Sequence, residues 1–229
     1  MKMVLTAAVL GLSALAAAGA AAADRQKNPP PNQGSPPPVP PQATVTLLED
    51  DFSQDNWGTA NDDRKTISYK GNTLNFVVHQ KNFFVWSTPD KETYRDIHME
   101  ARFIPNGSDV TTAFGFMCDH EGTTNNFYYM AVTPAGQYAI ARSAEGKTDV
   151  FLTNDDKWAF SDTISRNASS YRIGVDCGRQ LVLYVDGKEV DRVTDTTYSS
   201  GGVGVFVWSA EDAVKTDISL DDFVMTKLP

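Results

Sequence analysis

The sequence predicts an all-β fold, a sandwich or a barrel of antiparallel strands, and three observations support this class. Apolar and polar residues alternate with a period of two along many short stretches, which is the pattern of strands that bury one face. Turn-forming residues separate these stretches about every eight to twelve residues, as is typical of antiparallel all-β domains. No stretch longer than about two helical turns carries the apolar stripe of an amphipathic helix.

Length and charge limit the possible functions. The chain has 229 residues, enough for one large all-β domain after an N-terminal extension is set aside. Its 29 acidic residues outnumber its 20 Lys and Arg residues, which gives a formal net charge of −9. Because nucleic acids and anionic membranes select basic surfaces, neither is an expected partner. Neutral or cationic ligands fit this charge better.

Residues 1–23 are predicted to be a signal peptide rather than part of the fold. Lys2 provides a positive start, residues 4–15 are apolar, and small Ala and Gly residues lead to Ala23. A membrane anchor is the alternative, but the strongly apolar part is shorter than the ~20 residues that span a bilayer. We therefore expect a secreted or periplasmic protein whose mature form has no transmembrane segment.

Residues 24–44 read DRQKNPPPNQGSPPPVPPQAT and show no apolar periodicity. Proline fixes φ and removes an amide donor, so this segment is predicted to be an extended, disordered linker with polyproline II character. A ligand for a proline-recognising module is the alternative interpretation. The folded domain is then expected over residues 45–229.

The first strands of this domain follow from alternation and turn residues. One strand is expected near residues 46–52, and the next two, residues 73–79 and 82–87, are expected to neighbour each other. Residues 96–103 alternate most regularly, with four apolar residues on one face and four polar residues on the other. Residues 111–118 are apolar on both faces, which predicts a central strand.

The second half of the domain continues this rhythm. Residues 171–195 predict a hairpin whose turn is Asp186-Gly187, because this dipeptide readily takes positive φ at both centre positions of a type I′ turn. The tripeptide Asp-Asp-Phe occurs at 50–52 and again at 221–223, which predicts that the terminal strands lie side by side. Further strands are expected over residues 126–132, 137–142, 148–152, 203–208 and 216–225, with an irregular stretch over 154–168.

The order of these features resembles a known family. The resemblance is carried by the segments DDFS, NFFVWS, DIHMEARF, AFGFMCDHEGTTNNFYYM, YRIGVDCGRQLVLYVDGKEV, SSGGVGVFV and LDDFVM. Together they look like the concanavalin A-like, or laminin-G-like, jelly-roll domains of exported bacterial proteins, including the group with the 3-keto-disaccharide hydrolase domain. The resemblance implies two antiparallel sheets packed face to face, one of them concave. Lectins, carbohydrate-binding modules and glucanases share this fold, so the resemblance does not decide the function.

The cysteines agree with an exported protein. Cys118 and Cys177 are the only two in the chain, and each ends a predicted strand. In an oxidising compartment such a pair usually forms a disulfide. A zinc site is the alternative, but a suitably spaced pair of His residues is missing from the sequence.

The sequence offers little sign of catalysis. A glycosidase needs two carboxylates across a cleft, and the glucanases of the resembling fold carry them on an E-x-D-x-x-E strand, which this chain lacks. Asp96 and Glu100 share one strand face, but His98 separates them, and this pattern indicates a solvated face. The remaining acid–base candidates lie together after a predicted strand: Asp119, His120 and Glu121.

Aromatic residues are the candidates for binding a glycan, because sugar C–H groups stack on flat apolar rings. We select Trp86, Trp158 and Tyr128. The two tryptophans are preferred over Trp57 and Trp208 because each lies beside a polar loop. Core packing is the alternative role for any of these rings.

Calcium is the one cofactor that the sequence suggests. Asp50, Asp51, Asp221 and Asp222 lie on the terminal strands that are expected to be neighbours. Calcium takes about six to eight oxygen ligands, carboxylates among them, and structural calcium is familiar in the resembling family. The alternative is that strand alternation turns one Asp of each pair towards solvent.

From these observations we predict an exported, monomeric β-sandwich that binds a carbohydrate, such as a cell-envelope polysaccharide, without catalysis. One alternative is a glycoside hydrolase that acts on 3-keto-disaccharides. The other is a structural or adhesive domain of the cell envelope. The sequence alone does not name the ligand.

Overall fold

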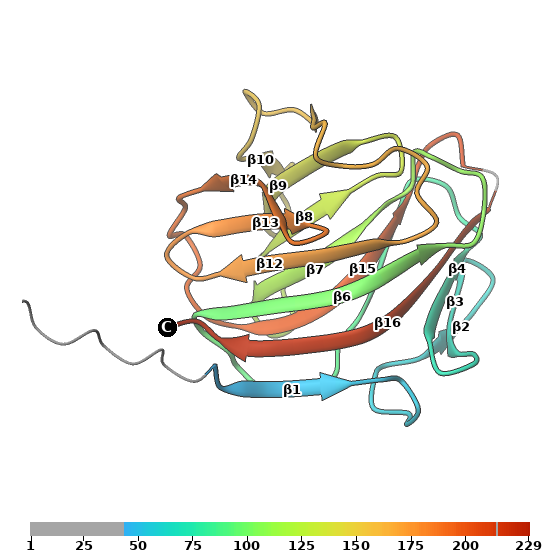
Figure 1. The fold of residues 1–229 in the computed structure, drawn as a ribbon, viewed down its shortest axis with the longest axis horizontal. Helices are drawn as coiled ribbons and strands as arrows, with labels where there is room; N and C mark the ends of the chain where they lie inside the picture. The colour runs from blue at the N-terminus through green and yellow to red at the C-terminus, as the bar shows by residue number, and fades with distance from the viewer. Residues whose placement is uncertain (1–43, 214) are drawn as a thin grey trace, which may run out of the picture. The chain divides into compact units, whose positions relative to one another are not determined.

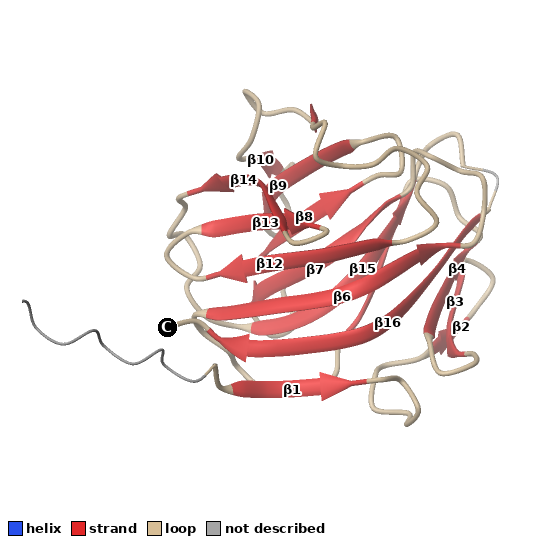
Figure 2. Ribbon diagram, viewed as in Figure 1, coloured by secondary structure: helices blue, strands red, loops and turns tan. Residues whose placement is uncertain are grey.

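The computed structural model describes residues 44–213 and 215–229, and its regular elements are sixteen β-strands (Figures 1 and 2). The predicted signal peptide and nearly all of the predicted linker lie outside these residues. Within the described ranges, no helix is long and apolar enough to cross a membrane.

The strands form two antiparallel sheets. The nine-stranded sheet has the order β14 (Lys188–Val193), β13 (Leu181–Val185), β12 (Tyr171–Cys177), β6 (Ile97–Pro105), β16 (Thr216–Lys227), β4 (Leu74–Val78), β3 (Lys65–Tyr69) and β2 (Ala60–Asn61), with β1 (Thr46–Asp50) also pairing with β16. The seven-stranded sheet has the order β10 (Val150–Phe151), β9 (Gln137–Ser143), β8 (Phe127–Val132), β7 (Ala113–His120), β15 (Gly202–Ser209) and β5 (Phe83–Ser87), with β11 (Ala159–Phe160) pairing with β9. The two-layer, all-β architecture predicted from the sequence is confirmed.

Alternation predicted the most regular elements well. On β6, Ile97, Met99, Ala101 and Phe103 are each at most 2% exposed, while the polar residues that alternate with them are partly exposed. Every residue of β7 except its last is buried, and the strand lies between β8 and β15 as a central strand should. In the hairpin between β13 and β14, Asp186 and Gly187 take φ values of 51° and 74°. Both positions are therefore left-handed, as a type I′ turn requires.

The prediction that residues 73–79 and 82–87 neighbour each other is wrong. β4 lies in the nine-stranded sheet beside β16, whereas β5 is the edge of the seven-stranded sheet and pairs with β15. The short connection through Asn82, which has a φ of 48°, carries the chain from one sheet to the other. Alternation identifies a strand but does not identify its partner.

β3 was not predicted from the sequence. Only Ile67 in this strand is buried, and its flanking residues are all partly exposed. Such a strand near the edge of a sheet leaves no clear alternation to read. The predicted strand over residues 148–152 is reduced to β10, and the irregular stretch that follows contains only β11.

A disulfide joins the two sheets. Cys118 on β7 and Cys177 on β12 are bonded, with their Cα atoms 6.5 Å apart and a sequence separation of 59. The predicted disulfide is confirmed, and the zinc alternative is wrong because each sulfur is bonded to the other.

The terminal strands lie side by side, as the repeated tripeptide predicted. β1 pairs antiparallel with β16, and Asp50 stands opposite Phe223. Phe52 and Phe223 both pack on Trp57, with ring centroids 5.6 and 4.9 Å away. The repeated phenylalanine thus seals one end of the core.

Candidate functional site

The two sheets have very different outer faces. On the nine-stranded sheet the outer face is polar: His98 Nδ1 lies 2.6 Å from an oxygen of Asp176, and Arg172 Nε donates to Glu100 at 2.6 Å. These cross-strand pairs lie on the solvated strand face that the sequence predicted for residues 96–103. The outer face of an antiparallel sheet is ordinarily polar in this way.

On the seven-stranded sheet the outer face is aromatic. We call it the outer aromatic face and define it by Phe84 and Trp86 on β5, Phe127 and Tyr129 on β8, and Phe206 and Trp208 on β15. Trp86 is 40% exposed and Trp208 is partly exposed. Two large apolar rings therefore stand on an outer face where polar side chains are expected. Phe127, Tyr129 and Phe206 are buried, so the part of this face that is open to a ligand is Trp86 with the partly exposed Phe84 and Trp208.

Phe84 is the centre of this face. Its ring stacks on Phe206 at 4.5 Å between centroids and approaches Trp86 at 6.1 Å and Trp208 at 6.3 Å. Trp158, from the irregular segment before β11, packs on Trp208 at 6.4 Å. The rings therefore hold one another in place, so a ligand would meet a preformed surface.

Small residues lie beside the rings on the neighbouring strands. Ala113 on β7, Ala131 on β8 and Ala141 on β9 belong to the same apolar cluster and point away from the core. Because these side chains are short, the aromatic rings and the β9–β10 connection rise above them. Two pockets lie on this face, and Ala113 lines the second of them.

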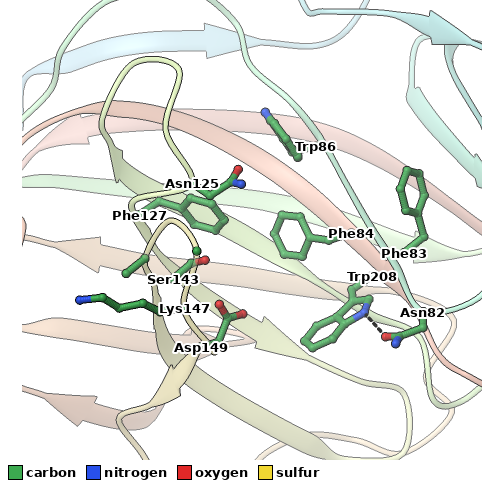
Figure 3. Close-up of a pocket in the computed structure, with 12 residues that line it drawn as sticks. Asn82, Phe83, Phe84, Trp86, Asn125, Phe127, Ser143, Lys147, Asp149 and Trp208 are labelled. Atoms are coloured by element: carbon green, nitrogen blue, oxygen red, sulfur yellow. Dashed lines mark hydrogen bonds between the residues drawn. The ribbon is translucent and has the colours of Figure 1, made fainter.

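The first pocket has a volume of about 380 Å³ (Figure 3). Phe84, Trp86 and Trp208 line one side of it. Polar residues near the start of β8, at the end of β9 and on the β9–β10 connection line the other side: Asn125, Ser143, Lys147 and Asp149. Apolar rings that face a few fixed polar groups are typical of a ligand site.

The second pocket has a volume of about 190 Å³ and shares Asn82 and Trp208 with the first. Its other lining residues include Gln137, Trp158 and Glu211. The indole N–H of Trp208 donates to Asn82 Oδ1 at 3.1 Å (Figure 3). Asn82 therefore fixes the ring that stands between the two pockets.

A tyrosine supports the polar side of the first pocket. The hydroxyl of Tyr129 donates to Asp149 Oδ2 at 3.0 Å. Burial, followed by the Asp149 charge, raises the pKa of Tyr129 far above its usual range, so the phenol keeps its proton. Asp149 is held as a hydrogen-bond acceptor beside the aromatic rings.

Neither pocket has the carboxylate pair of a glycosidase. Among their described lining residues, Asp149 is the one carboxylate of the first pocket and Glu211 that of the second. A two-carboxylate mechanism needs both groups around the same glycosidic bond. Neither pocket alone supplies both carboxylates from its described lining residues.

The three predicted acid–base residues do not converge. Asp119 is only 5% exposed, and burial together with the nearby Asp96 raises its pKa to about 6. His120 Nε2 bonds to the carbonyl oxygen of Thr124 at 2.8 Å, and Glu121 accepts from Asn126 at 2.8 Å. None of the three lines either pocket on the outer aromatic face.

The predicted aromatic residues divide between the site and the core. Trp86 lines the first pocket and Trp158 lines the second. The selection of Tyr128 is wrong, because this ring is fully buried between the sheets and its hydroxyl donates to Asp195. Strand alternation turns Tyr128 inwards while its neighbours Phe127 and Tyr129 point outwards.

The predicted calcium ligands have other partners. Asp50 accepts from the backbone N–H of Phe52 at 2.7 Å and from the indole N–H of Trp57 at 3.1 Å. Asp51 accepts from the Ser53 amide, and Asp221 and Asp222 pair with Arg102. Across residues 44–213 and 215–229, no group of three or more His, Cys, Asp or Glu side chains is placed to hold a metal ion. Calcium at the terminal strands stays a prediction without a preformed ligand group.

Several site residues were missed in the sequence. Phe84 could have been found, because it shares an outward face with Trp86 two residues later on a strand. Asn82, Lys147 and Asp149 lie outside the strands or in short connections, where no periodicity marks them. Their positions follow only from how the connections fold over the sheet.

The two stacked antiparallel sheets form a jelly-roll sandwich, and solved structures share this fold. The carbohydrate-binding module CBM66 from Bacillus subtilis aligns at 14% identity and a TM-score of 0.57, covering 76% of this chain and 98% of its own. A Bacillus licheniformis beta-glucanase aligns at 14% identity and a TM-score of 0.57, covering 82% of this chain and 100% of its own. A Bacillus subtilis protein of unknown function with a galectin-like fold aligns at 12% identity and a TM-score of 0.54, covering 80% and 96%.

No protein-family model matches the chain, and no curated protein sequence matches it either. At identities this low, the structural likeness establishes the fold alone. The neighbours include both a binding module and an enzyme, so the function has to be argued from the site.

Proposed function

We propose that this protein is an exported, non-catalytic carbohydrate-binding domain whose outer aromatic face is the binding site. The observation that supports it most directly is Trp86, a 40% exposed indole beside Phe84 on a sheet face that lines a pocket of about 380 Å³. Aromatic rings offer flat apolar surfaces to sugar C–H groups, while amide and carboxylate groups bind hydroxyls. Asn125 and Asp149 supply such polar groups across the pocket.

Two further observations support the non-catalytic and exported parts of the proposal. Each pocket has a single described carboxylate, which argues against a two-carboxylate hydrolase. The disulfide between Cys118 and Cys177 fits an oxidising compartment, which agrees with the leader-like residues 1–23. The similarity to a carbohydrate-binding module shows that this fold can carry such a function.

The test is a glycan array followed by calorimetry on the strongest hit, with wild type and Trp86→Ala compared. We expect Trp86→Ala to weaken binding about tenfold or more, because the exposed indole is the main stacking surface. Stability should change by less than about 1 kcal/mol, because much of the ring is already in water.

Phe160→Ala is the matched control. Phe160 is 65% exposed on β11 and lines neither pocket, so its removal should leave binding unchanged. Equal losses in both variants, or no glycan hit at all, would contradict the proposal. Release of product from 3-keto-disaccharides by the wild type would instead support the hydrolase alternative and remove the non-catalytic part.

A further inference from the structure

We infer that the outer aromatic face takes an extended, neutral oligosaccharide that crosses Trp208, with sugar units in both pockets, rather than a single sugar. This inference rests on the proposed function and adds the ligand class. It follows from the order of the two pockets along the strands, the way Trp208 is held, and the charges that line each pocket.

The two pockets lie towards opposite ends of the seven-stranded sheet. Asn125, Phe127 and Ser143 place the first pocket where β8 begins and β9 ends. Ala113 and Gln137 place the second pocket where β7 and β9 begin. Both pockets reach the same residue, Trp208, near the end of β15. A ligand that fills both must therefore run along the strand direction and pass over this indole.

Trp208 is held firmly enough to serve as this crossing point. Its indole N–H donates to Asn82 at 3.1 Å, and the ring centroids of Phe84 and Trp158 lie 6.3 and 6.4 Å from its own. Asn82 lines both pockets as well. Asn82 is thus a positioning residue, because it acts on a ligand mainly by fixing Trp208.

The sizes of the pockets indicate how the units divide. The first pocket, about 380 Å³, has twice the volume of the second, about 190 Å³. Sites that take ligands of drug size measure about 300–1,000 Å³, so the first pocket alone is large enough for more than one sugar unit and the second suits one. A trisaccharide or longer chain is the smallest ligand expected to fill both.

The charges favour a neutral chain. Glu211 is the one charged side chain among the described residues of the second pocket, so an acidic sugar there would meet a carboxylate without a compensating cation. Lys147 and Asp149 give the first pocket one charge of each sign. The protein as a whole has a formal net charge of −9, which further disfavours binding of a polyanionic glycan.

The inference is tested by calorimetry on the full-length protein with ladders of β-linked glucose, galactose and N-acetylglucosamine units, from monosaccharide to hexasaccharide. Affinity should rise about tenfold or more between the disaccharide and the tetrasaccharide and then level off, because both pockets are then filled. Trp158→Ala should lower affinity for the longer chains roughly three- to tenfold and leave the shortest binding ligand unaffected, because Trp158 lines only the second pocket.

Asn82→Ala supplies the second arm. Without the amide the indole of Trp208 loses its fixed orientation, so the gain in affinity with length should shrink while short ligands still bind the first pocket. Phe160→Ala is the control, and melting curves confirm that each variant is folded. Affinity that does not rise with length, or a Trp158→Ala loss that is equal for short and long ligands, would overturn the inference and leave the proposed function standing. Failure of every ladder and every array glycan would overturn both.

Discussion

At the scale of single residues, the buried carboxyl of Asp119 makes the folding stability depend on pH. This carboxyl is 5% exposed, and burial with the nearby Asp96 raises its pKa from 3.8 to about 6. Between these two pH values the folded state binds more protons than the unfolded state, so folding stability falls as pH rises through this window. At about one pKa unit per 1.4 kcal/mol, the loss reaches up to about 3 kcal/mol at neutral pH.

Asp119→Asn should remove this cost. The amide cannot ionise, so we expect the variant to be more stable than wild type by about 1 to 3 kcal/mol near pH 8 and to lose that advantage near pH 4. Urea unfolding at the two pH values measures the difference. Asp63→Asn, at an exposed position, is the control and should show little change at either pH. An equal effect of Asp119→Asn at both pH values would contradict the raised pKa.

The residues of β8 show what a sequence can and cannot reveal. Alternation predicts that Tyr128 points away from Phe127 and Tyr129, and the structure has this arrangement. Which side is the core cannot be read, because all six residues of β8 are buried and both faces are apolar. Lys147 and Asp149 were harder still, since a short connection carries no period. Trp86 was predictable because a polar loop precedes its strand.

At the scale of elements, the packing of β7 against β8 depends on a glycine. Gly115 stands opposite Ala131, and a Cβ atom at Gly115 would lie 2.0 Å from the carbonyl oxygen of Met130. That neighbour is backbone and cannot rotate away. Gly115→Ala should therefore destabilise the protein by about 3 kcal/mol or more, because a central strand pair would have to shift.

Gly107→Ala is the matched control for this substitution. An added Cβ there meets nothing within 4 Å, so we expect a change of less than about 0.5 kcal/mol in the free energy of unfolding. Denaturant unfolding of the two variants makes the comparison. If Gly115→Ala were as stable as Gly107→Ala, the close approach of β7 and β8 at this point would be wrong.

Among the elements, local features were predictable from the sequence, whereas the pairing of distant strands was not. The alternation of β6 and the Asp186-Gly187 turn were predictable because each depends on neighbours in sequence. The assignment of β4 and β5 to different sheets was not, since β4 pairs with β16 and β5 with β15, both from the far end of the chain. Long-range pairing is chosen by the packing of the whole core rather than by any one strand.

At the scale of the whole molecule, the two outer faces explain why the fold class was easier to predict than the site. Both sheets share one core, so alternation throughout the chain reports the same two-layer arrangement. Among the described residues, a second apolar cluster lies on the other side of the seven-stranded sheet alone. In sequence, a strand that is apolar on both faces is equally consistent with burial in the core and with a ligand surface.

The disulfide connects the two sheets through β7 and β12, so its removal tests how much this connection contributes to folding stability. In the chain-entropy description, a crosslink that closes a loop of this length stabilises the folded state by about 4 kcal/mol, mainly by restricting the unfolded chain. The double variant Cys118→Ala, Cys177→Ala should therefore unfold at a lower guanidinium concentration. The fold itself should persist, because the bond is one contact in a core that both sheets build.

Unfolding of oxidised wild type, reduced wild type and the double variant separates the crosslink from the side chains. Reduced wild type and the double variant should be similarly destabilised, and added reductant should not change the double variant. If the double variant were weakened much more than reduced wild type, packing of the sulfur atoms would be the larger effect. If neither differed from oxidised wild type, the bond would not hold the two layers together. Glycan binding by the folded double variant should be retained, because neither cysteine lines a pocket on the outer aromatic face.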